Sequence, residues 1–81
     1  MYGKKEFGKE LKLNLEKGLR SAELGHWVYG VYIRNISEID KELQEIMLFL
    51  NTMEDGPEFE LSYEELDKIA DELIAGKDVK L

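Results

Sequence analysis

The chain has 81 residues and a net charge of −7, with 43% hydrophobic and 36% charged residues, which suits one small globular domain spanning residues 1–81. It has no cysteine and one histidine, which excludes disulfides, thiolate metal sites and multi-histidine metal sites. The negative charge disfavours nucleic acid, and no apolar stretch approaches the roughly 18 residues of a membrane span. We therefore expect a cytoplasmic protein with no nucleic-acid or membrane partner.

Hydrophobic periodicity and helix-ending residues predict four helices. They cover roughly residues 4–17, 22–34, 38–54 and 63–75. The links between the first three helices are short, which favours antiparallel neighbours. The expected fold is therefore all-α, a small antiparallel four-helix bundle.

The first helix has one apolar face, because Phe7, Leu11 and Leu15 recur every four residues. Gly18 suits the left-handed position that follows a helix. Gly8 lies inside the helix and lowers its propensity by about 1 kcal/mol relative to alanine.

The second helix is expected to begin after Ser21, a plausible N-cap. Its main stripe follows helical spacing and consists of Leu24, Trp27, Val28, Val31 and Tyr32. Tyr29 and Ile33 lie off this stripe, so the helix is apolar almost all round and is either enclosed or part of an interface. The β-branched and aromatic run at residues 28–33 would also suit a strand, but the helical spacing favours a helix.

The third helix is expected to begin after Ser37, whose hydroxyl is a candidate cap. Its core stripe consists of Ile39, Leu43, Ile46, Met47, Leu50 and Met53. Gly56 and Pro57 predict its end, since proline cannot continue a helix. The alternation at residues 58–61 predicts an extended segment with Phe59 and Leu61 pointing inward.

The fourth helix has the clearest start in the chain. Ser62 and Glu65 match the capping box, and Leu61 and Leu66 can form a hydrophobic staple. Its buried face is expected to consist of Leu66, Ile69, Ala70, Leu73 and Ile74. Gly76 predicts its end.

The negative charge is concentrated in the second half of the chain. Residues 1–34 carry seven basic and four acidic side chains, whereas residues 35–81 carry four basic and fourteen acidic ones. The densest cluster consists of Glu54, Asp55, Glu58, Glu60, Glu64, Glu65 and Asp67. Such a cluster attracts basic protein surfaces, or it serves only to keep the chain in solution.

Candidate chemistry is sparse, so we expect no enzyme, no cofactor and no metal. His26 has no second histidine to work with, and the serines are explained as helix caps. The acidic loop lacks the spacing of an EF-hand. There is no glycine-rich phosphate loop, because Gly25 and Gly30 fall inside the second helix, where close helix packing is their simpler role.

Four stretches resemble, in order and layout, small helical immunity proteins of bacteria. They are residues 18–24 (GLRSAEL), 40–46 (DKELQEI), 50–57 (LNTMEDGP) and 62–66 (SYEEL). The similarity spans residues 18–76 and is to the colicin D immunity-like group, which includes immunity proteins of contact-dependent inhibition toxins. The resemblance implies a four-helix protein whose acidic side chains occupy the basic RNA-binding cleft of a nuclease toxin.

The leading hypothesis is therefore an immunity protein that neutralises a cognate bacterial toxin, a nuclease, by covering its basic cleft. The expected partner-binding residues are Glu54, Asp55, Glu58, Phe59, Glu60, Tyr63, Glu64 and Glu65. Tyr63 and Phe59 would be aromatic anchors, since a few such contacts dominate interfaces. The alternative is a non-catalytic helical adaptor or a homodimeric module that docks through the second helix.

Overall fold

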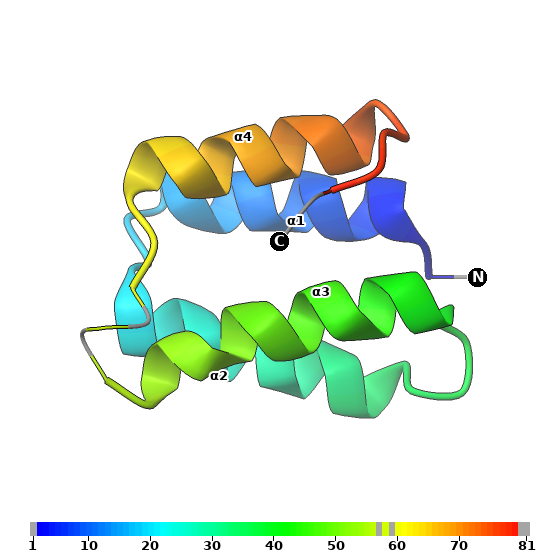
Figure 1. Cartoon of the computed structure of the whole chain (residues 1–81), viewed down its shortest axis with the longest axis horizontal. Helices are drawn as coiled ribbons and strands as arrows, with labels where there is room; N and C mark the ends of the chain where they lie inside the picture. Colours follow the sequence, from blue (N-terminus) through cyan, green and yellow to red (C-terminus); the bar gives the residue numbers. More distant parts are fainter. Residues whose placement is uncertain (1, 57, 59, 80–81) are drawn as a thin grey trace.

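The computed structural model describes residues 2–56, 58 and 60–79 of the chain. This part forms four α-helices, a short 3₁₀ turn and no strand (Figure 1). The elements are α1 (Lys4–Glu16), α2 (Ser21–Arg34), α3 (Lys41–Asn51), η1 (Thr52–Glu54) and α4 (Tyr63–Ile74). The predicted all-α four-helix bundle is confirmed, and the strand alternative for residues 28–33 is wrong.

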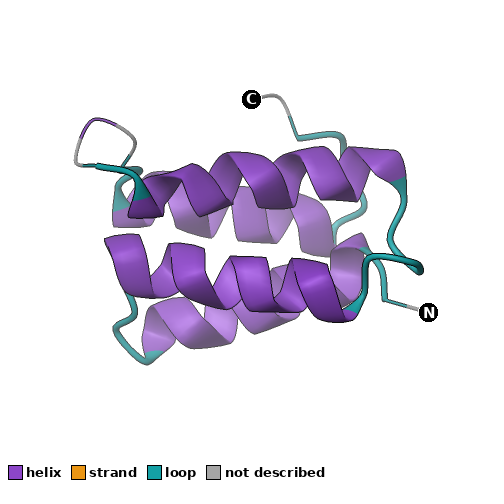
Figure 2. Ribbon diagram, turned by 90° about the horizontal axis from the view of Figure 1, so that it is seen from below, coloured by secondary structure: helices purple, strands orange, loops and turns teal. Residues whose placement is uncertain are grey.

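The helices pack as two antiparallel pairs. α1 lies against α4, and α2 lies against α3 and η1. Figure 1 shows the α1–α4 pair stacked on the α2–α3 pair, with consecutive helices running in opposite directions, and Figure 2 shows the helices side by side along one common direction. This arrangement follows from the short links, which leave little chain for any crossover.

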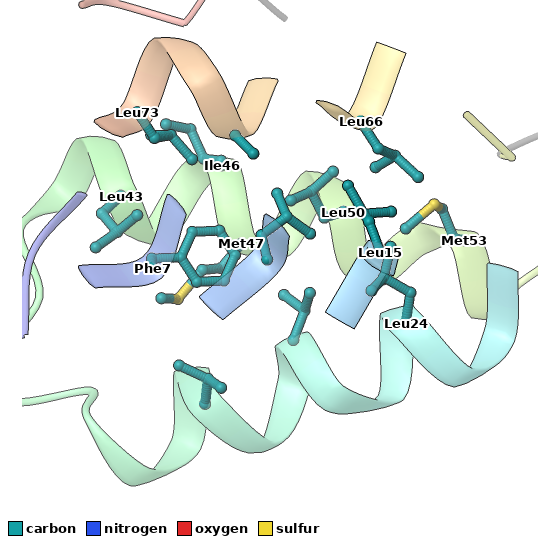
Figure 3. Packing of buried hydrophobic residues seen from close by; sticks show 14 of the residues in the cluster. Phe7, Leu15, Leu24, Leu43, Ile46, Met47, Leu50, Met53, Leu66 and Leu73 are labelled. Carbon is teal, nitrogen blue, oxygen red and sulfur yellow. The ribbon is translucent and has the colours of Figure 1, made fainter. Parts of the chain in front are cut away.

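One hydrophobic core joins the two pairs, and every helix contributes to it (Figure 3). Phe7 of α1 stacks on Trp27 of α2, with ring centroids 5.5 Å apart and an angle of 5° between the planes. Each large side chain buried in this way stabilises the fold by about 1.5–3 kcal/mol. The fully buried large side chains are Phe7, Leu11, Leu15, Leu24, Val28, Val31, Leu43, Ile46, Met47, Leu50, Leu66 and Leu73.

Two helices end on glycines, as predicted. Gly18 and Gly76 have φ angles of +93° and +75°, in the left-handed region that other residues rarely adopt. After α4, the N–H of Lys77 donates to the carbonyl oxygen of Glu72 at 2.9 Å, which closes a Schellman motif. The same motif closes α1 at Gly18.

Two predicted helix starts are wrong. Ser37 lies in the link, and α3 begins three residues later than expected, with the Asp40 carboxylate accepting from the N–H of Leu43 at 2.8 Å. Ser21 is the first residue of α2, not its cap, and Arg20 holds the N-cap position. The last turn expected in the third helix is the 3₁₀ turn η1.

Candidate protein-binding surface

The predicted site residues follow one another from η1 through the first turn of α4, in the yellow part of Figure 1. Phe59 lies outside the described residues, so its predicted role as an anchor stays a prediction. Leu61 packs against the core, as expected. The backbone of Glu58 has 3₁₀ geometry and not the extended geometry that the alternation predicts.

Four carboxylates of this stretch are exposed and lack a basic partner within the part of the chain that the structure describes. They are Asp55, Glu58, Glu60 and Glu64, and we call them the acidic segment. Because these carboxylates are solvated and have no ion-pair partner among the described residues, an incoming cation does not have to displace one there.

Glu54 is held by the fold instead. Its carboxylate lies 3.4 Å from Nδ1 of His26. With its side-chain amide oriented to donate, Asn51 bonds to Glu54 Oε2 at 2.8 Å and to the carbonyl oxygen of Gly25 at 3.0 Å. Glu54 also lies over Gly25, where a Cβ atom would come within 2.9 Å of its Cγ. This residue therefore fastens η1 to α2, a role that the sequence did not predict.

Glu65 is also engaged, in the capping box that the sequence predicted. The N–H of Ser62 donates to Glu65 Oε1 at 2.9 Å, and the N–H of Glu65 donates to the Ser62 hydroxyl at 3.1 Å. The hydrogen bond from the Ser62 backbone, followed by that from its side chain, lowers the pKa of the Glu65 carboxyl. Glu65 thus stabilises the start of α4, and its predicted contact with a partner protein stays a prediction.

Tyr63 is 39% exposed, but one face of its ring is covered. The guanidinium of Arg20 lies 4.7 Å from the ring centroid, which is a cation–π contact. Arg20 also donates to the carbonyl oxygens of Leu15 and Leu19 at the end of α1. Sequence spacing gave no signal for this contact, because the two residues are far apart in the chain.

Two acids further along α4, Asp67 and Asp71, are neutralised from α1. Lys12 Nζ lies 3.4 Å from Asp67 and also pairs with Asp71. The hydrogen bond to Asp71 raises the pKa of Lys12. Asp67 belongs to the cluster seen in the sequence, and the acidic surface therefore stops at the first turn of α4.

An open hollow of about 650 Å³ lies beside this boundary. It is lined by Tyr63, Glu64, Asp67, Lys68, Asp71, Glu72, Ala75 and Lys77. Tyr63 and Glu64 of the predicted site line the hollow, and the two lysines make it mixed in charge. Next to the hollow, the exposed acids that lack a basic partner among the described residues lie on the loop before α4 and in its first turn.

The comparisons with known proteins give no relative. No protein-family model, no curated protein and no solved structure matches the chain. Across residues 2–56, 58 and 60–79, three or more histidine, aspartate or glutamate side chains nowhere gather as metal ligands would. In the same residues, no helix has the length and apolarity needed to cross a bilayer.

Proposed function

We propose that this chain is an immunity protein that acts in the cytoplasm of a bacterium and neutralises a cognate toxin. The toxin is a nuclease, and the acidic segment covers its basic active-site cleft. The class of protein is the one that residues 18–76 resemble. The exposed carboxylates of the acidic segment support the choice of binding surface.

The observation that carries the proposal is the exposed state of the acidic segment. Lysines elsewhere serve the fold, since Lys12 binds Asp67 and Asp71 and Lys4 lies 2.8 Å from Glu42. Asp55, Glu58, Glu60 and Glu64 have no such partner among the described residues. Carboxylates exposed in this way can take the place of substrate phosphates in a cleft lined by lysine and arginine.

Electrostatic attraction explains how the acidic segment would work. Exposed charge of one sign raises the rate of association with an oppositely charged surface more than it raises the final affinity. The affinity would come from a few desolvated contacts. Tyr63 is the described aromatic residue best placed to make one.

A growth assay tests the proposal. The product of the adjacent coding region is produced alone, with this chain, or with an unrelated acidic helical protein of similar charge. We expect growth arrest that only this chain relieves. If no neighbouring product arrests growth, or if the unrelated acidic protein relieves the arrest equally well, the immunity proposal is wrong.

A further inference from the structure

Helix α2 carries a second apolar stripe on the side opposite its core stripe. Leu24, Val28 and Val31 are buried in the core. The outward stripe consists of Ala22, Tyr29 and Ile33, with the polar His26 between them, and of Ile36 in the turn after the helix. Its four positions on the helix are spaced by four, three and four residues, which is the heptad spacing of a coiled-coil seam. A helix that packed on one side only would not need this second stripe.

The outward stripe is open to solvent. Tyr29, Ile33 and Ile36 are 45%, 49% and 47% exposed, a high share for large apolar side chains that lie on one face. Gly30 flanks the stripe, and a Cβ atom there would meet only the guanidinium end of Arg34 within 4 Å. Packing within the chain therefore does not require a glycine at this position. Because glycine has no side chain, a second helix can approach α2 closely here.

The charges beside the stripe are complementary to those of a second copy. Glu23 and Arg34 are eleven residues apart, so they lie on the same edge of α2, about three turns from one another. Both are exposed, and neither takes part in an ion pair within the described residues. An antiparallel copy of α2 brings each Glu23 opposite the other copy's Arg34, whereas in a parallel two-fold pair the two edges lie on opposite sides of the seam and these charges do not meet.

We infer that the outward stripe of α2 pairs with the same stripe of a second copy of this chain, antiparallel and about a two-fold axis. The axis crosses α2 at the level of residues 28 and 29, midway between Glu23 and Arg34. Tyr29 of both copies therefore meets near the centre, where an aromatic side chain contributes most. One helix face makes a small interface, so the dimer dissociates in the micromolar range. The acidic segment has no part in this interface.

Sedimentation equilibrium over about 1 to 500 µM protein tests the dimer directly. We expect the wild type to shift from monomer to dimer and Ile33→Glu to weaken association at least about tenfold, because it places two carboxylates in the seam. Leu13→Glu is the matched control, since Leu13 is 55% exposed on the outer face of α1. It is expected to dimerise like the wild type. Circular dichroism verifies that both variants remain helical.

A charge exchange tests the antiparallel orientation. Glu23→Arg and Arg34→Glu are each expected to weaken association about tenfold, because the dimer contains each pair twice. The double exchange is expected to restore association to within about threefold of the wild type. A wild type that stays monomeric throughout, an Ile33→Glu variant that dimerises normally, or a double exchange without rescue would each overturn the inference. A toxin that binds this stripe on a chain that is monomeric alone would overturn it as well.

Discussion

Gly8 and Gly30 both lie inside helices, but Gly8 is crowded by a neighbouring helix and Gly30 is not. The two glycines therefore affect the stability of the fold differently. Gly8 of α1 faces α4, where a Cβ atom would come within 2.9 Å of the carbonyl oxygen of Ala70 and of Leu73 Cβ. Gly30 of α2 faces only the flexible end of Arg34. From the sequence, Gly8 was interpreted as a weakness of its helix, but the structure places it at the closest approach of α1 and α4.

Replacing each glycine with alanine separates the two roles. Gly8→Ala is expected to lower the free energy of unfolding by about 1–3 kcal/mol, because overpacking outweighs the gain in helix propensity. Gly30→Ala is expected to raise it by about 0.5–1 kcal/mol in dilute, monomeric protein. Urea denaturation measures both changes. An equal effect of the two substitutions would contradict the close contact between α1 and α4.

At the scale of single residues, sequence patterns found the local interactions and missed the distant ones. The capping box of Ser62 and Glu65 and the glycine ends of α1 and α4 were predicted, because each depends on residues a few positions apart. The contacts of Arg20 with Tyr63 and of Lys12 with Asp71 were not predicted, because only the packing of α1 on α4 brings these residues together. The intramolecular contact of Glu54 with His26 was missed for the same reason, while the predicted contacts of Glu54 and Glu65 with a partner protein stay predictions.

At the scale of whole elements, α4 begins at the residue predicted from the sequence, whereas α3 begins later than predicted. Ser37 and Asp40 are both capping residue types, and local preference does not choose between them. The structure uses Asp40 and places Ile39 in the link, buried at 6% exposure. The packing of Ile39 therefore sets the start of α3, and periodicity alone had assigned this residue to the helix.

The capping box of α4 makes stability depend on pH. The pKa of Glu65 is lower in the folded chain than in the unfolded one. The ionised Glu65 carboxylate therefore contributes fully to the free energy of unfolding above the unfolded pKa, about 4.3. This contribution is lost as the pH falls through the lower pKa of the folded chain. Glu65→Gln keeps the shape and an acceptor but cannot ionise.

Thermal unfolding at pH 7 and pH 3, followed by circular dichroism at constant ionic strength, tests this dependence. The wild type is expected to lose more stability than Glu65→Gln on acidification, so the gap between the two proteins narrows. The other carboxyls titrate in both proteins and do not affect the comparison. An identical loss of stability in the wild type and in Glu65→Gln would show that the charge of Glu65 does not stabilise the start of α4.

At the scale of the molecule, the basic residues 1–34 neutralise part of the charge of the acidic residues 35–81. Lys4 pairs with Glu42, Lys12 pairs with Asp67 and Asp71, and Arg20 covers Tyr63. These contacts tie α1 to α3 and α4. The exposed negative charge that remains on the loop before α4 and in its first turn is the acidic segment, and the proposed toxin contact depends on it.

The association rate with the toxin is the most direct test of that dependence. The variant Asp55→Asn/Glu58→Gln/Glu60→Gln is compared with Glu16→Gln/Glu38→Gln/Glu45→Gln, which removes the same charge from exposed acids elsewhere. In stopped-flow measurements at low salt, we expect the first variant to associate about tenfold more slowly with a weaker salt dependence, and the second to stay within about twofold of the wild type. Equal rates for the two variants, or wild-type association that is insensitive to salt, would contradict the account.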